Sequence, residues 1–348
     1  FNTYQEVKKG DFIFCLFDVE ETPRCVGLSD FDGMITGAYT VMEPYDNFDR
    51  NYLYYFYLNL DADKRLKPLY TGLRNTISKE NFFSFKTFVP TLSEQTPIAV
   101  FLDRKTALID QAIGIKQKQI ELLKERRQIL IHKAVTRGLN PNVKMKDSGI
   151  EWIGEIPEHW ETRKLKSVSD YITEKGIPSS SDVRISPENV EQGTGVCLNL
   201  YSEYDNEGFK FQRGDILFNK LRVYLSKVIL TSYEGYSMGE MIVVRPRKIN
   251  NQFLFHIMLS YGFINSCNSF NIGVKLPRVS PEVIFNSVVP IPPIKEQNRI
   301  VEIINENFQE TSNIISLEKR KIDLLKEYRQ SLISEVVTGK IDVRNNVN

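Results

Sequence analysis

The 348-residue chain is a tandem duplication, because features of its first half recur in the same order in its second half. The matching segments lie about 202 to 204 residues apart: residues 9–14 with 213–218, residues 94–95 with 296–297, and residues 122–128 with 324–330. Such an ordered set of matches indicates one structural unit that occurs twice. The chain must therefore fold as two related units rather than as one large core.

Each unit begins with short apolar alternations separated by Gly, Pro and Asn, which predicts a mixed domain with a curved sheet and a few helices. Each unit then ends in a long helix with apolar residues in heptad rows. We therefore expect an α+β fold, with two mixed α/β domains joined by two long antiparallel coiled-coil helices. The expected seam residues are Leu102, Ile109, Lys116, Leu123 and Leu130 in the first copy, and Ile304, Glu318, Leu325 and Leu332 in the second.

Two charged residues fall inside these seam rows, Lys116 in the first helix and Glu318 in the second. If the helices run antiparallel with matched centres, the two charges meet and set the register of the pair. Two other interpretations stay open: a Lys stem can also extend out of a seam, and each helix could simply pack on its own domain.

The repeat also predicts domain boundaries and a missing part. Phe1 corresponds to about Asp205, so we expect a counterpart of residues 150–204, roughly 50 to 70 residues, ahead of Phe1. The expected segments are a first domain at 1–92, a long helix at 93–138, a linker at 139–160, a second domain at 161–292, a second helix at 293–338 and a tail at 339–348.

No motif in the sequence indicates a catalytic centre. The chain has neither a phosphate-binding loop of the Gly-x-x-x-x-Gly-Lys type nor a Gly-x-Gly-x-x-Gly turn, and its three histidines are scattered. Glu94 and Glu296 each follow a proline bend, where an acidic side chain stabilises the start of a helix. The four cysteines lack metal-ligand spacing and are expected to be reduced thiols, and no run of eighteen apolar residues occurs. We therefore expect a cytoplasmic, metal-free protein without a membrane span.

Basic residues mixed with Asn and aromatic residues instead suggest contact with DNA. In an extended segment Lys220, Arg222 and Tyr224 would share one face, and such cations suit phosphates and guanine edges. A solvated surface is the alternative for each of these residues. The candidate DNA-binding residues are Lys175, Lys220, Arg222, Tyr224, Lys227, Lys275 and Arg278 in the second unit, and Arg24, Arg74 and Asn75 in the first.

The whole chain resembles the specificity subunits of type I restriction–modification enzymes. The resemblance is strongest at residues 147–160, at the Gly-Asp-Ile-Leu-Phe-Asn-Lys-Leu-Arg-Val-Tyr stretch from Gly214, and at residues 290–297 and 324–339. It implies two target-recognition domains, related by a pseudo-twofold axis, that recognise the two halves of a bipartite double-stranded DNA sequence, with helices that set the gap between the halves. It also implies DNA contact for Lys220, Arg222 and Tyr224, although Val223 stands where the family often has proline.

The same resemblance implies a non-catalytic subunit of a bacterial defence complex. Its expected partners are two methyltransferase subunits and restriction/translocase subunits, and S-adenosylmethionine, ATP and Mg are expected on those partners rather than on this chain. Two alternatives remain open at this point. One is the recognition subunit of a bifunctional methyltransferase–nuclease, and the other is a coiled-coil adaptor that binds proteins. The target sequence and gap length are not encoded in any motif.

Overall fold

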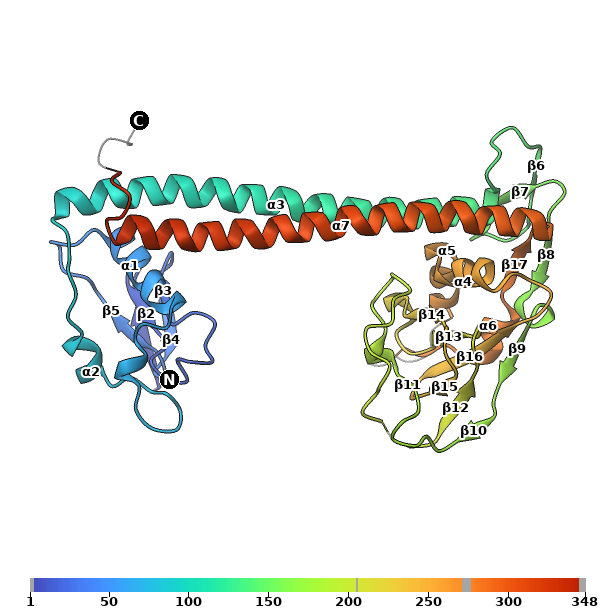
Figure 1. Cartoon of the computed structure of the whole chain (residues 1–348), viewed down its shortest axis with the longest axis horizontal. Helices are drawn as coiled ribbons and strands as arrows, with labels where there is room; N and C mark the ends of the chain where they lie inside the picture. The colour runs from blue at the N-terminus through green and yellow to red at the C-terminus, as the bar shows by residue number, and fades with distance from the viewer. Residues whose placement is uncertain (1–2, 205, 271–276, 344–348) are drawn as a thin grey trace. The chain divides into compact units, whose positions relative to one another are not determined.

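The computed structural model describes residues 3–204, 206–270 and 277–343, and the chain forms two compact units. Unit 1 comprises residues 1–119 and 316–348, and unit 2 comprises residues 120–315. Helix α3 (Leu92–Arg137) and helix α7 (Ile294–Val337) each contribute residues to both units (Figure 1).

The described residues of unit 2 contain two four-stranded sheets, with strand orders β14-β13-β16-β9 and β10-β12-β15-β11. The elements of this unit between the two long helices are β6 (Met145–Asp147), β7 (Glu155–Pro157), β8 (Glu161–Lys164), β9 (Ser169–Ile172), β10 (Lys175–Gly176), β11 (Arg184–Ile185), β12 (Gly208–Phe211), β13 (Ile216–Asn219), β14 (Val228–Leu230), β15 (Gly235–Ser237), β16 (Met241–Pro246), α4 (Asn251–Leu259), α5 (Tyr261–Asn268), α6 (Pro281–Asn286) and β17 (Val288–Ile291).

The described residues of unit 1 contain smaller versions of the same sheets, with orders β3-β2-β5 and β1-β4. Its elements are β1 (Tyr4–Val7), β2 (Phe12–Phe14), β3 (Val26–Leu28), β4 (Gly33–Thr36), β5 (Thr40–Met42), α1 (Arg50–Ala62) and α2 (Lys79–Ser84). By the sequence offset, β2, β3 and β5 correspond to β13, β14 and β16, and β1 corresponds to β12.

The central sheet of unit 2 is buried on both faces at its inner strands β13 and β16, whose residues are mostly apolar. Ile216 and Phe218 of β13 belong to the larger core, which α4, α5 and the helix ends complete, whereas the intervening Leu217 packs into a second cluster with Val243. Successive side chains of a strand point to opposite faces, so a continuous apolar run is the pattern that such a sheet requires.

A buried glutamine ties each long helix to the domain that precedes it. Gln95 accepts a hydrogen bond from the backbone N–H of Asp49 at 2.9 Å and donates one to the carbonyl of Pro90 at 2.9 Å. Gln297 makes the same two bonds with Asn250 and Pro292, at 2.8 Å each. Because Asp49 and Asn250 are the N-caps of α1 and α4, each glutamine fixes one helix start against another.

The acidic residues before these glutamines differ in role. Glu94 caps its helix by accepting hydrogen bonds from the backbone N–H and the hydroxyl of Thr91, as the sequence predicted. Glu296 also lies in the first turn of its helix, but its carboxylate lies 2.6 Å from His159 Nε2 and accepts a 2.8 Å hydrogen bond from Trp160 Nε1.

The long helices pair in opposite directions within unit 1. Lys116 Nζ lies 2.9 Å from Glu318 Oε2, and Arg329 Nη1 donates to Asp110 Oδ1 at 2.8 Å. Residues later in α3 contact residues earlier in α7, so the two helices run antiparallel. The predicted α+β fold with two long antiparallel helices is confirmed, and the two charged residues meet as their positions suggested.

The unit 2 part of the same helix pair contains a cation–aromatic contact. The Arg127 guanidinium lies over the Phe308 ring, 3.2 Å from its centroid, and burial lowers the pKa of Arg127 to about 10. The His256 ring meets the same phenylalanine edge-on at 5.5 Å. A cation stacked on an aromatic face retains an electrostatic partner in a site that excludes water.

Candidate nucleic-acid interface

The loop after β13 lies beside the segment 277–279 in unit 2. Arg222 donates its backbone N–H to the carbonyl of Pro277 at 2.8 Å, and Val279 donates to the carbonyl of Lys220 at 3.0 Å. These bonds place the candidate cations Lys220, Arg222 and Arg278 in one small surface region. We call this region, residues 219–227 with 277–279, the unit 2 loop pair.

The expectation that Lys220, Arg222 and Tyr224 share one face of an extended segment is wrong. Strand β13 ends at Asn219, whose side chain hydrogen-bonds both the N–H and the carbonyl of Leu221. Arg222 then adopts a left-handed conformation with φ of 51°, and a short 3-10 helix follows at Val223–Leu225. An Asn side chain that bonds its neighbouring backbone favours a turn over a continued strand.

An acidic residue that the sequence analysis did not select organises the charges of this loop pair. Glu240 binds Lys220 Nζ at 2.9 Å through one carboxylate oxygen and Arg278 Nη2 at 2.6 Å through the other. Arg222 and Tyr224 are exposed next to this bridge. A carboxylate and guanidinium groups therefore occupy the same surface. The guanidinium groups can contact guanine edges or phosphates, and the carboxylate can accept a hydrogen bond from cytosine N4.

Two further described candidates, Lys227 and Lys175, bind partners other than Glu240. Lys227 donates to the carbonyl of Pro187 at 2.6 Å, so its charge supports a neighbouring loop. Lys175 lies on β10 and pairs with Glu207 at 2.6 Å. Lys275 lies outside the described residues.

Unit 1 contains an equivalent loop pair, residues 15–24 with 74–77. Asp18 has a φ of 47° and donates its backbone N–H to the carbonyl of Arg74 at 2.9 Å, as Arg222 does with Pro277. Two of the three unit 1 candidates, Arg74 and Asn75, therefore lie on the counterpart of the segment that carries Arg278. Arg24 lies on the same loop pair and donates to the Tyr54 hydroxyl at 3.2 Å.

The two loop pairs share a backbone path but not their charges. In unit 1 the left-handed position is the acidic Asp18, and bidentate hydrogen bonds from Arg74 hold the pKa of this carboxyl below its usual value. In unit 2 the same position is the basic Arg222. The repeat offset connects Asp18 with Arg222, so this equivalence was detectable in the sequence, whereas the contacts of Glu240 were not.

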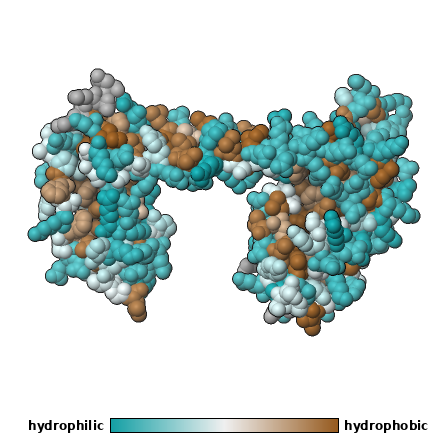
Figure 2. Space-filling view, in the orientation of Figure 1, coloured by the Kyte–Doolittle hydropathy of each residue, from teal (hydrophilic) through white to brown (hydrophobic). Residues whose placement is uncertain are grey.

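The long helices carry a second candidate surface, which is formed by exposed apolar side chains. In unit 1, Leu108 and Ile115 of α3 and Leu317 and Leu324 of α7 are about half exposed, and Tyr328 is exposed beside them. In unit 2 the same spacing continues with Leu122 and Ile129. Except for Tyr328, these residues recur every seven positions along their helix, and each lies one residue before a seam residue, as Leu108 does before Ile109. An antiparallel pair keeps such equivalent positions on one side. Figure 2 shows apolar residues, in brown, on the surface of the two helices.

The described residues contain no group of three or more His, Cys, Asp or Glu side chains that could hold a metal ion. Among the helices of the described residues, none is long and apolar enough to cross a membrane. The cysteines are free thiols, and Cys15, Cys25 and Cys267 are buried.

Sequence comparisons identify a known domain in the second half of the chain. Residues 157–327 match the family model described as the type I restriction modification DNA specificity domain. Residues 157–327 therefore form a type I restriction modification DNA specificity domain, which covers just under half of the chain.

Particular relatives agree with this assignment. The MjaVIII specificity subunit of Methanocaldococcus jannaschii is 27% identical over 327 residues, covering 85% of this chain and 71% of the relative. The EcoDI specificity subunit of Escherichia coli is 23% identical over 286 residues, covering 76% of this chain and 64% of the relative. The chain thus spans about two thirds of the length of these relatives. A chain from a solved type I restriction–modification structure has the same fold, with a TM-score of 0.71, 13% identity, and coverage of 97% of this chain and 84% of that chain.

Proposed function

We propose that this chain is the DNA-recognition subunit of a type I restriction–modification complex, and that each loop pair contacts one half of a bipartite duplex target. The observation that carries the proposal is the repeated loop geometry with different charges. The two loop pairs have equivalent backbones but carry different side chains. The unit 1 loop pair carries Asp18 and Arg74, and the unit 2 loop pair carries Arg222 and Arg278 beside Glu240. Such a difference suits the recognition of two different half-sites.

The chemistry of each loop pair supports base recognition as well as phosphate binding. An Arg guanidinium can pair bidentately with the O6 and N7 atoms of guanine, and a carboxylate can accept a hydrogen bond from cytosine N4. Lys220 and Lys227 hold internal partners, so Arg222 supplies an exposed cation of the unit 2 loop pair. Lys175, Lys275 and Arg24 complete the proposed contact set.

The apolar side of the helix pair is the proposed docking surface for methyltransferase subunits. Exposed apolar residues in a heptad pattern fit the apolar side of partner helices. In this assembly the chain performs no chemistry itself. The methyltransferase subunits carry S-adenosylmethionine, the restriction/translocase subunits carry ATP and Mg, and the complex acts on DNA in the cytoplasm.

The first experiment is selection from a randomised duplex pool with the chain bound to its cognate methyltransferase subunit, at two salt concentrations. We expect a two-part motif with a fixed gap and an affinity that falls steeply with salt. Arg222→Ala should relax one half of the motif, and Arg74→Ala should relax the other. Lys166→Ala, at an exposed lysine outside both loop pairs, is the matched control and should leave both halves intact.

Failure of the two parts of the proposal can be distinguished. If no sequence is enriched while the methyltransferase subunit still co-purifies, the chain is a protein-binding adaptor and the DNA proposal is wrong. The docking surface is tested with Ile115→Glu, which should abolish co-purification without loss of helix content because Ile115 is already half exposed. Lys124→Glu, also exposed on α3, should leave co-purification unchanged.

A further inference from the structure

One carboxylate of unit 2 holds two of the candidate DNA-binding cations in an ion cluster. An oxygen of Glu240 lies 2.9 Å from Lys220 Nζ, and its other oxygen lies 2.6 Å from Arg278 Nη2. The side chains of Glu240 and Lys220 are 24% and 28% exposed, so solvent and salt screen their attraction less than that of a fully exposed pair. Arg278 is 57% exposed, so it can also contact a ligand. The carboxylate therefore cancels one of two positive charges on the surface proposed to contact DNA.

Backbone hydrogen bonds hold the members of this cluster together independently of their charges. Lys220 donates its backbone N–H to the carbonyl of Glu240 at 3.0 Å. The residue after Arg278, Val279, donates in turn to the carbonyl of Lys220 at 3.0 Å. Removal of the Glu240 carboxylate leaves both bonds in place. A change in DNA binding after such a substitution therefore reports on the lost charge.

Unit 1 shows that the shared backbone of the loop pairs does not require these charges. The counterparts of the cluster follow from equivalent hydrogen bonds between the two segments of each loop pair, and from the equivalent registers of the β2–β5 and β13–β16 ladders. The counterparts are all uncharged: Leu16 for Lys220, Ala38 for Glu240 and Thr76 for Arg278. Because the fold forms with a neutral set in one unit, the charged set of the other unit is available for a task besides folding.

A carboxylate at this position opposes general attraction to DNA. Phosphates attract free cations whatever the base sequence, and each phosphate contact adds about 0.9 to the steepness of log K against log salt concentration. Lys220 and Arg278 must leave Glu240, or share it, before they neutralise a phosphate. A carboxylate that has lost its cations then faces a polyanion, which is unfavourable unless a base supplies a hydrogen-bond donor. The major-groove amino group of cytosine is a donor that a glutamate accepts.

We propose that Glu240 is a specificity-determining residue of the unit 2 loop pair. Its carboxylate restrains Lys220 and Arg278 from the phosphates of DNA that lacks the target, and accepts a hydrogen bond from the amino group of a cytosine in the correct half-site. The inference rests on the proposed function, because it concerns how the unit 2 loop pair distinguishes its half-site from other DNA. It assigns to one residue a role that weakens binding to DNA in general and favours one base.

The test compares Glu240→Gln with the wild type, each bound to the cognate methyltransferase subunit. Glutamine keeps the shape of glutamate without its charge, so Lys220 and Arg278 lose their counter-ion. We expect the affinity for a duplex that carries neither half of the motif to rise about tenfold at low salt, and log K to fall more steeply with log salt concentration by about one to two. Selection from the randomised pool should lose a cytosine from the unit 2 half of the motif and leave the unit 1 half unchanged.

A second variant separates the loss of restraint from the loss of the cations. Lys220→Leu combined with Glu240→Ala and Arg278→Thr gives unit 2 the uncharged set of unit 1. The variant should fold, which urea unfolding followed by tryptophan fluorescence checks, because unit 1 accommodates the same set on the same backbone. It should lose base preference in the unit 2 half of the motif, and it should bind a duplex without the motif no more tightly than the wild type does.

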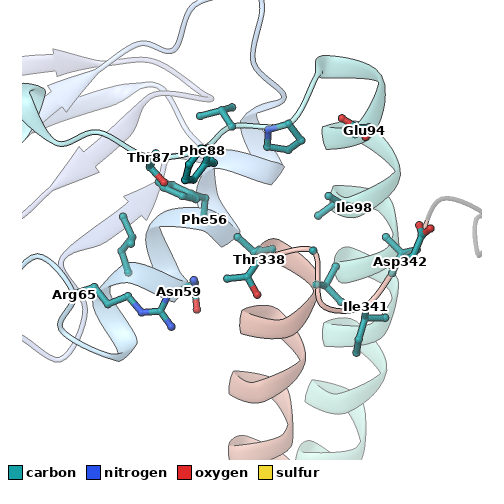
Figure 3. A pocket seen from close by; sticks show the side chains of 17 residues that line it. Phe56, Asn59, Arg65, Thr87, Phe88, Glu94, Ile98, Thr338, Ile341 and Asp342 are labelled. Atoms are coloured by element: carbon teal, nitrogen blue, oxygen red, sulfur yellow. The ribbon is translucent and has the colours of Figure 1, made fainter.

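Two controls each remove a carboxylate from an exposed ion pair outside both loop pairs. Glu161→Gln releases Arg163 in unit 2, and Asp63→Asn releases Arg65 in unit 1. Arg65 lines a pocket of about 560 Å³ at the end of α7, and the residues around this pocket include none of the unit 1 loop pair (Figure 3). Neither control should change the salt dependence or the motif.

The outcomes separate this inference from the proposed function. An unchanged motif together with an unchanged salt dependence in Glu240→Gln would overturn the inference and leave the proposed function standing. A weaker affinity of Glu240→Gln for a duplex without the motif would also overturn it, because the carboxylate would then support binding in general. A wild-type complex without any sequence preference would refute the proposed function, and this inference with it.

Discussion

The buried histidine of unit 2 makes a quantitative prediction about pH. His256 is 2% exposed, and burial, with a smaller contribution from the Arg127 charge, lowers its pKa to about 4, while the amide of Asn305 opposes the shift. In the unfolded chain its pKa returns to about 6.5. Between these values the unfolded state binds a proton that the folded state does not. The free energy of unfolding therefore falls as the pH drops from about 6.5 to about 4, and is unaffected above that window.

The size of the effect follows from the difference between the two pKa values. A depression of about 2.5 units, at 1.36 kcal/mol per unit, gives a full contribution of about 3 kcal/mol. At pH 4.5, where most of the change has occurred, the expected loss relative to pH 7.5 is about 2.5 kcal/mol. His256→Leu removes the titrating group and keeps a side chain of similar volume, so this part of the pH dependence should disappear.

The assay is urea unfolding followed by tryptophan fluorescence at pH 7.5, 6.5, 5.5 and 4.5. The chain has two tryptophans, Trp152 and Trp160, and both lie in unit 2, so their signal reports the unit that contains His256. Subtracting the variant from the wild type cancels the titration of carboxylates and of His132, whose pKa burial also lowers. A wild-type-minus-variant difference that changes by less than about 0.5 kcal/mol across this range would refute the reasoning.

Further predictions concern the charges of the helix seam and the repeated aspartates. Lys116→Glu should lower the midpoint of urea unfolding of unit 1, measured by circular dichroism. Adding Glu318→Lys to this variant should restore much of the lost midpoint, and no restoration would mean that the two residues are not coupled. Asp215→Asn should lower the free energy of unfolding by about 2–3 kcal/mol in the fluorescence assay. The substitution removes the carboxylate that binds Arg245 through two hydrogen bonds, and the Arg245 side chain is only one third exposed. Asp11 is the counterpart of Asp215 but accepts only a turn hydrogen bond from the backbone N–H of Lys8, so Asp11→Asn should lower the free energy of unfolding by about 0.5–1 kcal/mol, measured by hydrogen exchange of β2. Equal losses in the two variants would contradict this reasoning.

The sequence was sufficient for the fold because its signals are periodic or repeated. Heptad rows specify which face of a helix meets its partner, and the duplication then supplies that partner. The meeting of Lys116 with Glu318 follows from those two facts once the helices are taken to run antiparallel with matched centres. The buried Gln95 and Gln297 were visible as repeated residues, but only the structure shows that each one bonds a helix cap and a proline carbonyl.

The candidate site was less predictable because it depends on long-range contacts and on one local turn. Alternation around Lys220 resembled a strand, yet the side chain of Asn219 bonds the backbone of Leu221 and ends the strand there. Glu240 lies twenty residues from Lys220 and gives no local sign that it will bridge Lys220 and Arg278. The repeat could have predicted which loops lie side by side. It could not have predicted which charged side chains pair with one another.

The hydrogen bonds of Gln95 and Gln297, which attach each long helix to its domain, have a consequence for how such proteins diversify. Both bonding partners of Gln95, and likewise those of Gln297, belong to the same copy of the repeat. The two copies are nearly identical at residues 122–128 and 324–330, well downstream of these ties. A genetic crossover within that shared stretch would exchange a whole recognition domain together with its own attachment to the helix. New combinations of domains could then arise by recombination without any need to re-evolve the joint.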